Sequence, residues 1–225
     1  MSKKTVILGT AHGGNVAGKC SPDKSFYEYK YSREIISELK AELECDGYTV
    51  LVDIPAAAVP SRQSAELSCR CAIVNNICER YGAGNCIYVS IHVNAAGNGS
   101  EWKTAGGWCA YTSKGKTSAD ALATNLYEAA KESLQDYAKS MESLKKSGSY
   151  GSSQQPFRTD YSDKDADLES NFYVLAHTQC AAVLTENLFQ DNKCDVAFLT
   201  SDKGRRAIVE LHKNGIERYF EQCSK

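Results

Sequence analysis

Two histidines and a glutamate stand where short apolar segments of the sequence end. His92 closes the apolar run in residues 85–94 and is followed two residues later by the amide of Asn94. His12 follows the apolar residues 5–8, and Glu186 follows the apolar residues 181–184. Open α/β sheets place their chemistry at the carboxyl ends of strands, so we expect the three side chains to share one site.

Two imidazoles and a carboxylate are the protein ligands of many hydrolytic zinc ions, which keep their fourth position for water. A second carboxylate then acts as general base. The residues alone do not assign these two carboxylate roles, for which there are four candidates: Glu28, Glu66, Glu101 and Glu186. The remaining histidines, His177 and His212, fall within predicted helices, and we expect structural roles for them.

The elements that position these residues alternate along the chain. Apolar residues at helical spacing predict helices over residues 28–46, 62–81, 118–145, 171–178 and 200–220. Short apolar runs predict strands over residues 5–8, 48–54, 85–94, 107–112 and 181–186. This alternation predicts a single α/β domain over residues 1–225, a three-layer sandwich with a mostly parallel twisted sheet flanked by helices.

One long segment carries neither pattern. Residues 147–156, Ser-Gly-Ser-Tyr-Gly-Ser-Ser-Gln-Gln-Pro, cannot continue the helix before them, and residues 157–170 are rich in acidic side chains. We predict a mobile loop over residues 147–170.

Composition excludes several classes of partner. Lys and Arg number 26 against 28 Asp and Glu, so the net charge of −2 gives no attraction to nucleic acid or anionic lipid. The apolar residues 5–8 are too few for a signal peptide or a membrane span, although removal of a signal would leave the same appearance. We expect a monomer with no membrane span.

The ten cysteines include several in apolar segments, which favours buried free thiols over disulfides.

Four motifs resemble those of the zinc-dependent N-acetylmuramoyl-L-alanine amidases of the type 3 family. Val89-Ser-Ile-His-Val-Asn-Ala95 is similar to the family's Ser-Ile-His-x-Asn signature around a zinc histidine. Gly9-Thr-Ala-His-Gly-Gly14 is similar to its Asp-Pro-Gly-His-Gly-Gly, with the first three residues replaced. Glu28 opens a helix that closes at Asp46-Gly47-Tyr48, as the family's metal-binding glutamate does before its Gly-Tyr.

The fourth motif lies near the end of the chain. Ala181-Ala-Val-Leu-Thr-Glu-Asn-Leu-Phe-Gln-Asp-Asn192 is similar to the family's Pro-Ala-Val-Leu-Val-Glu-x-Gly-Phe-x-x-Asn, with Asn187 and Leu188 where small residues are usual. Arg70 and Asn75 also resemble an Arg and an Asn of the helix before the second zinc histidine, although surface and capping contacts explain them equally well. The resemblance extends from about residue 5 to residue 220.

The resemblance implies an enzyme and its site. Zn²⁺ would be held by His12, Glu28 and His92, with Glu186 as the catalytic residue and Asn94 and Arg158 as substrate-binding residues. The substrate would be peptidoglycan, cut at the amide between N-acetylmuramic acid and L-alanine of the stem peptide. The protein would act on the cell wall, in the periplasm or outside the cell, either as a phage endolysin released at lysis or as a host amidase.

Two other functions remain open from the sequence. A peptidoglycan-binding or sensory module could keep the fold without catalysis, although such a module has no need of Glu186. A zinc carboxypeptidase acting on stem peptides could use the same residues. The products of digestion distinguish all three functions.

Overall fold

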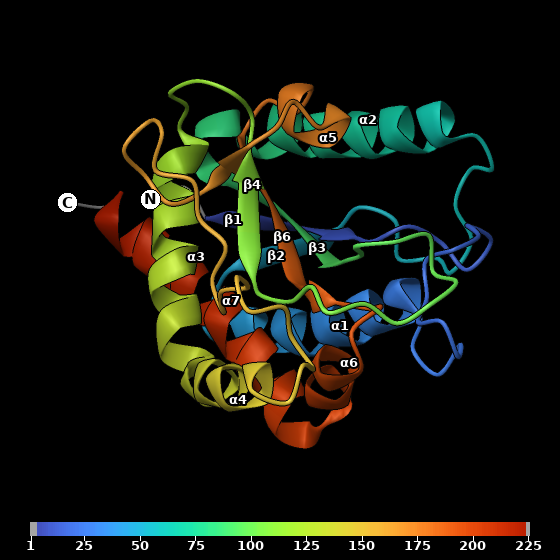
Figure 1. Cartoon of the computed structure of the whole chain (residues 1–225). Helices are drawn as coiled ribbons and strands as arrows, with labels where there is room; N and C mark the ends of the chain where they lie inside the picture. Colours follow the sequence, from blue (N-terminus) through green and yellow to red (C-terminus); the bar gives the residue numbers. More distant parts are fainter. Residues whose placement is uncertain (1–3, 224–225) are drawn as a thin grey trace.

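The computed structural model describes residues 4–223, which form one α/β domain around a six-stranded sheet (Figure 1). The strands lie in the order β2-β1-β3-β6-β4-β5. Their bounds are Thr5–Thr10 for β1, Thr49–Val52 for β2, Cys86–Asn94 for β3, Cys109–Thr112 for β4, Leu168–Glu169 for β5 and Ala181–Phe189 for β6. Only the β4–β6 pair is antiparallel among these strands. The predicted single domain with a mostly parallel sheet is confirmed.

Helices cover both faces of the sheet (Figure 1). One face packs against α1 (Glu28–Cys45), α3 (Ala119–Ser133), α4 (Gln135–Lys145), α6 (Lys193–Thr200) and α7 (Asp202–Gln222), and forms the larger apolar core. The other face packs against α2 (Gln63–Tyr81) and α5 (Tyr173–Ala176) over a smaller core. No helix in the described part of the chain combines the length and the apolar character needed to cross a membrane.

The two faces follow from the alternation of side chains along each strand. In β3, Val89 and Ile91 belong to the larger core, whereas Tyr88 belongs to the smaller one. In β6, Val183 belongs to the larger core and Leu184 to the smaller one. The same period of two places His92 and Glu186 on the face covered by α2 and α5, near the carboxyl ends of their strands.

Apart from the exact ends of the elements, the structure differs from the sequence-based prediction at three places. The helix expected over residues 118–145 is interrupted at Leu134, whose ψ of 21° leaves the helical range, so that α3 and α4 are separate. No proline or glycine marks this break. Helix α6 was not predicted; the Asn192 side chain caps it by accepting hydrogen bonds from the N–H groups of Cys194 and Asp195. Strand β5 contains two residues, too few to show a period.

The segment 147–170 is irregular apart from β5, and it contacts the rest of the fold at several points. The Tyr150 hydroxyl donates to Asp195 Oδ1 at 2.6 Å, and Tyr137 on α4 donates to the same oxygen. The Arg158 N–H donates to the Trp108 carbonyl oxygen at 2.8 Å. The Thr112 hydroxyl donates to Asp167. The lack of regular structure agrees with the predicted loop, and its mobility stays a prediction.

His212 on α7 gives a testable pH dependence of stability. Its ring is fully buried, with Nδ1 2.7 Å from the Ile208 carbonyl oxygen and Nε2 2.9 Å from the Thr185 hydroxyl. Burial lowers the pKa of His212 from 6.5 to about 4. Because the folded pKa lies below the unfolded one, its contribution to stability is complete above pH 6.5 and is lost as the pH falls through 4.

We therefore expect His212→Gln to lose less stability than the wild type when the pH is lowered from 7 to 4. The difference between the two losses should be about 3 kcal/mol, since each unit of pKa shift corresponds to about 1.4 kcal/mol. Urea unfolding of both proteins at the two pH values measures it. Equal losses in the two proteins would show that His212 is not the titrating group.

Candidate metal centre

Three elements bring His12, Glu28 and His92 together. His12 follows β1, Glu28 is the first residue of α1, and His92 lies near the end of β3. One ligand atom from each lies within 4.8 Å of the others, the one such group found among residues 4–223. His92 Nδ1 is 3.1 Å from Glu28 Oε1, and His12 Nε2 is 3.7 Å from Glu28 Oε2. The two imidazole rings meet edge to face with centroids 5.1 Å apart.

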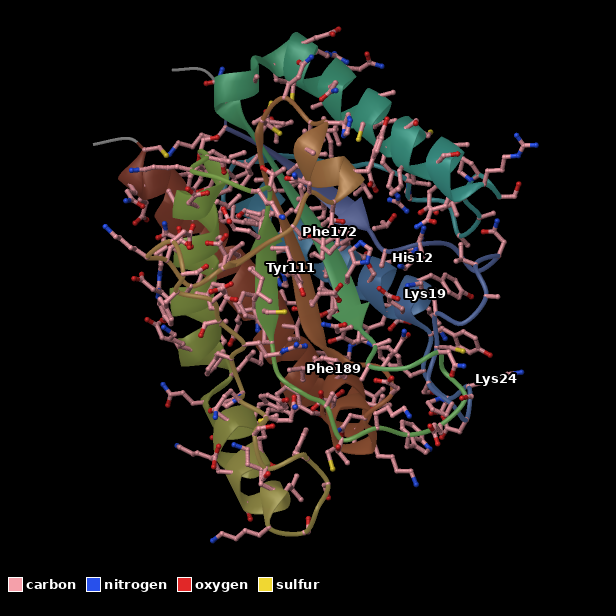
Figure 2. The ribbon with its side chains drawn as sticks, turned by 45° about the horizontal axis from the view of Figure 1, so that its top comes forward. His12, Lys19, Lys24, Tyr111, Phe172 and Phe189 are labelled. Carbon is pink, nitrogen blue, oxygen red and sulfur yellow. The ribbon has the colours of Figure 1, made fainter. Side chains whose placement is uncertain are left out.

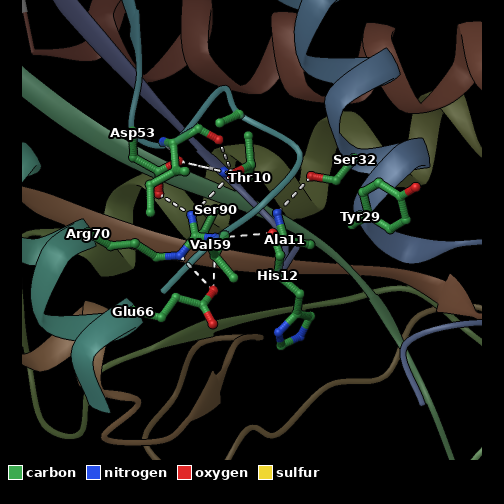
Figure 3. Close-up of polar contacts among 12 residues, drawn as sticks. Thr10, Ala11, His12, Tyr29, Ser32, Asp53, Val59, Glu66, Arg70 and Ser90 are labelled. Carbon is green, nitrogen blue, oxygen red and sulfur yellow. Dashed lines mark hydrogen bonds and ion pairs between the residues drawn. The ribbon is translucent and has the colours of Figure 1, made fainter. Parts of the chain in front are cut away.

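The backbone at His12 is held in an unusual conformation. Its φ of 37° lies in the left-handed region, which non-glycine residues seldom adopt without support. The His12 carbonyl oxygen accepts hydrogen bonds from Arg33 at 2.9 Å and from Arg70 at 3.4 Å. The preceding N–H, of Ala11, donates to the Ser32 hydroxyl on α1 (Figure 3). The Ser32 hydroxyl in turn donates to the Ile91 carbonyl oxygen on β3. These bonds link the backbones that carry His12 and His92.

Arg70 belongs to a buried polar network beside His12 (Figure 3). Its guanidinium donates to Asp53 at 2.6 Å and to Glu66 at 2.9 Å. Asp53 also accepts the Thr10 N–H at 2.9 Å. Arg70 therefore supports the end of β1, a role that the sequence left undecided against surface and capping contacts.

Close packing beneath this network explains the residue at position 9. The Tyr88 hydroxyl donates to Asp53 at 2.9 Å, and its ring crosses directly over Gly9. A Cβ atom at position 9 would lie 2.4 Å from the Tyr88 oxygen, closer than nonbonded atoms approach. Only glycine fits this position without movement of the Tyr88 ring.

The charges of the three residues suit a divalent cation. Burial opposes ionisation of Glu28, but the hydrogen bond from His92 and the nearby imidazoles outweigh it and lower the pKa. Burial lowers the pKa of His12 to about 3, so its imidazole is neutral, the form that binds metals. Glu28 Oε2 is buried and has no hydrogen-bond partner among the described residues. Two imidazoles and an ionised carboxylate with an unpartnered oxygen fit Zn²⁺.

Glu186 lies beside this group. It pairs with His92 in the β3–β6 register. Burial is the main cause that raises its pKa well above the usual range; the negative charge of Glu28 adds to it, and the charges of Lys19 and Arg158 oppose it. Glu186 Oε2 is also buried without a hydrogen-bond partner in the described part of the chain. A carboxyl group with a raised pKa can both take up and release a proton near neutral pH.

A cavity of about 230 Å³ opens onto these residues. Its polar lining includes His12, His92 and Glu186, and its apolar wall is formed by Leu67, Phe172, Tyr173, Val174 and Leu184. Phe172 and Tyr173 are more than a third exposed, and the Phe172 ring lies beside Tyr111 with centroids 5.0 Å apart (Figure 2). The site therefore combines ionisable groups with a partly open aromatic wall.

The other carboxylates proposed from the sequence have different partners. Glu66 lines the cavity but is bonded to Arg70, and Glu101 is exposed and pairs with Lys103. Neither belongs to the described metal-ligand group.

The two predicted substrate-binding residues lie outside the residues that line this cavity. The Asn94 side chain accepts a hydrogen bond from the Ala95 N–H at 2.8 Å. The Arg158 guanidinium lies 5.2 Å from the centre of the Phe189 ring. Their roles in substrate binding stay predictions.

Two further residues support His92 and were not identified from the sequence. The Ser90 hydroxyl is 3.1 Å from His92 Nε2. Asn187 donates from its amide to the His92 carbonyl oxygen at 2.9 Å and accepts from the Trp108 indole at 2.9 Å. The alternation of side chains along β3 already places Ser90 on the same face as His92, whereas no local pattern points to Asn187.

Comparison with known proteins identifies the family. The fold resembles that of an N-acetylmuramoyl-L-alanine amidase from Clostridium difficile 630, with a TM-score of 0.73, 21% identity and 98% of each chain covered. It also resembles the catalytic domain of the amidase CwlV from Bacillus (Paenibacillus) polymyxa var. colistinus, with a TM-score of 0.69, 17% identity, and coverage of 97% of this chain and 98% of that one.

A stretch of 57 residues, 25% of this chain, is 46% identical to an endolysin of Bacillus phage SPP1 and spans 20% of that protein. Residues 6–218 match the family described as N-acetylmuramoyl-L-alanine amidase. This match covers nearly the whole chain and agrees with the four motifs noted in the sequence. The chain therefore belongs to the type 3 family of N-acetylmuramoyl-L-alanine amidases.

Proposed function

We propose that this chain is a zinc-dependent amidase that hydrolyses the bond between N-acetylmuramic acid and L-alanine in peptidoglycan. The observation that carries the proposal is the group His12, Glu28 and His92 beside the buried carboxyl of Glu186. Family membership supports amidase chemistry on peptidoglycan. The ligand set and the separate carboxyl support zinc hydrolysis within that chemistry.

His12, Glu28 and His92 would hold the ion through two imidazoles and one carboxylate. When bound, Zn²⁺ polarises a carbonyl group and makes water more acidic. The protein holds the three ligands through bonds that do not depend on the ion. Arg33 and Arg70 hold the His12 backbone, and the Val93 N–H donates to Glu28 at 3.2 Å. The geometry needed for binding is thus largely set by the fold.

Glu186 would act as the general base and then as the general acid. Its carboxylate takes a proton from the attacking water, and the resulting carboxylic acid gives that proton to the nitrogen of the leaving amine. Burial and the charge of Glu28 raise its pKa, which favours both transfers near neutral pH. An apolar wall that includes Leu67, Leu184 and Phe172 lies beside the reacting groups.

The remaining parts of the proposal concern the substrate and the place of action. Asn94 and Arg158 would bind peptidoglycan at the edges of the site. The positive charge of Arg158 acts to lower the pKa of Glu186, which places its guanidinium near the reacting groups. The stretch shared with a phage endolysin supports action on the cell wall, in the periplasm or outside the cell. We expect the protein to act there as a monomer.

Digestion of purified peptidoglycan tests the proposal. The protein loaded with zinc should release free stem peptides that begin with L-alanine, and a chelator should stop the release. Mass spectrometry of the soluble products identifies the bond that is cut. Release of single carboxyl-terminal amino acids would instead identify a carboxypeptidase. Stoichiometric zinc without any released product would identify a binding or sensory module.

A further inference from the structure

A second hollow is formed by the loop that follows His12, and it shares no lining residue with the first cavity. It has a volume of about 380 Å³ and is lined by residues 14–20 with Lys24, Tyr27 and Tyr29. We call it the basic groove, because its lining contains two lysines and two tyrosines but no acidic residue. Figure 2 shows Lys19 close to His12 and Lys24 farther out.

The lysines of the basic groove form no ion pair with the described residues. Among residues 4–223, neither Lys19 nor Lys24 takes part in an ion pair. Other lysines, such as Lys40 and Lys103, do pair with exposed carboxylates. The one carboxylate in residues 14–27 is that of Asp23. Its Oδ1 accepts hydrogen bonds from the hydroxyls of Ser21 and Ser25, both at 2.7 Å. Neither ammonium group is therefore bonded to a carboxylate of the described residues, and the Lys19 charge acts on Glu28 only from beyond ion-pair distance.

The backbone that carries Lys19 is tied to the metal centre. The Lys19 carbonyl oxygen accepts the N–H of Glu28 at 3.1 Å, and the Ser21 N–H donates to the Phe26 carbonyl oxygen at 2.9 Å. Cys20 and Tyr27 form an isolated antiparallel bridge. Burial has the largest influence on the pKa values of His12, Glu28 and Glu186, and the positive charge of Lys19 acts to lower all three. Lys19 is half-buried, and its backbone is held by these hydrogen bonds. Its charge lies close enough to act on the reacting groups.

We propose that the basic groove binds the acidic stem peptide, with the Lys19 ammonium pairing with a peptide carboxylate. This rests on the proposed function, because the stem peptide is the leaving side of the amide that the enzyme cuts. A charge-assisted hydrogen bond to a carboxylate satisfies an ammonium that has no partner in the chain. The tyrosines beside it offer hydroxyls and ring faces to the peptide backbone. The aromatic wall at Phe172 is then left for the sugar side of the bond.

A matched pair of substrates tests the assignment. Two synthetic muropeptides, identical except that one stem-peptide carboxyl is free or amidated, are given to the zinc-loaded wild type and to Lys19→Gln. The wild type should favour the free acid about fivefold in kcat/KM, the order of magnitude of one partly exposed ion pair. Lys19→Gln should lose this preference, so that its kcat/KM values for the two substrates become equal, whatever the change in its absolute rate.

Lys116→Gln is the control for net charge. Lys116 is exposed and follows β4. Because β4 runs antiparallel to β6, its carboxyl end lies at the opposite end of the strands from His92. This variant should keep the wild-type preference. Equal rates on the two substrates for the wild type, or an unchanged preference in Lys19→Gln, would overturn the assignment.

Calorimetry separates this inference from the proposed function. The free stem peptide, prepared with and without the same carboxyl group, is titrated into the wild type and into Lys19→Gln. Weaker binding of the acid by Lys19→Gln supports the basic groove even if the wild type cuts neither muropeptide, an outcome that would refute only the amidase. Cleavage with no effect of Lys19→Gln in either experiment would refute only the groove.

Discussion

Glu186→Gln should lower kcat for peptidoglycan hydrolysis by about 10³-fold, the middle of the range for general acid–base catalysis, and should leave zinc bound. Glutamine has the shape of Glu186 but cannot take a proton from water and pass it to the leaving amine. The bound metal should stay because Glu186 is outside the group of ligand atoms that lie within 4.8 Å of one another. The measurements are kcat on a muropeptide and the zinc content of the purified variant.

Glu101→Gln is a suitable control, because Glu101 is an exposed carboxylate that pairs with Lys103. Its removal changes the net charge equally and should leave kcat unchanged. Loss of zinc from Glu186→Gln would make Glu186 a ligand rather than a base. Full activity in that variant would move the proton transfer to another residue.

Glu28→Gln should weaken zinc binding by more than about 100-fold, because changes to residues that merely orient the ligands already weaken it 10- to 100-fold. The amide can still accept the Val93 N–H, so the local fold is kept. The substitution removes the one carboxylate of the ligand group and with it the negative charge that faces the metal. Competition with a chelator of known affinity measures the change. Thermal unfolding with and without zinc should also show a smaller stabilisation in the variant.

Glu66→Gln provides the matched control for this experiment. Glu66 is buried and lines the same cavity, but its carboxylate bonds to Arg70, and a glutamine oxygen can still accept that bond. This variant should keep zinc with nearly wild-type affinity. Equal loss of zinc in both variants would mean that any carboxylate in the cavity supports binding through its charge alone.

The sequence identified the residues of the candidate site more completely than the residues that support them. His12, His92 and Glu186 could be grouped because each follows an apolar run, and strands that run in parallel end at one edge of a sheet. Glu28 could not be chosen over Glu66 or Glu101 from the residues alone, and its role came from resemblance to the family. The structure places Glu28 against both histidines, Glu66 against Arg70 and Glu101 in solvent.

Support for the site was harder to predict because it depends on contacts between distant segments. Arg70 reaches Asp53 and the His12 carbonyl oxygen, and Asn187 reaches the His92 carbonyl oxygen. The interruption of the helix at Leu134 has no local breaker, and α4 instead contacts the Asp195 carboxylate through Tyr137. In each case the partner is far away in the sequence, where no periodicity links the two residues.

Local patterns were sufficient for the type of each main element and for the face on which its side chains lie, because helical and strand periods act over a few neighbouring residues. They predicted that His92 and Glu186 stand at strand ends, whereas β3 continues to Asn94 and β6 continues three residues past Glu186 to Phe189. The order of the strands and the antiparallel direction of β4 come from the packing of the whole chain. That packing sets the distances among His12, Glu28 and His92 and leaves no described carboxylate within ion-pair distance of Lys19. Metal binding and substrate recognition depend on such distances, which no spacing along the chain specifies.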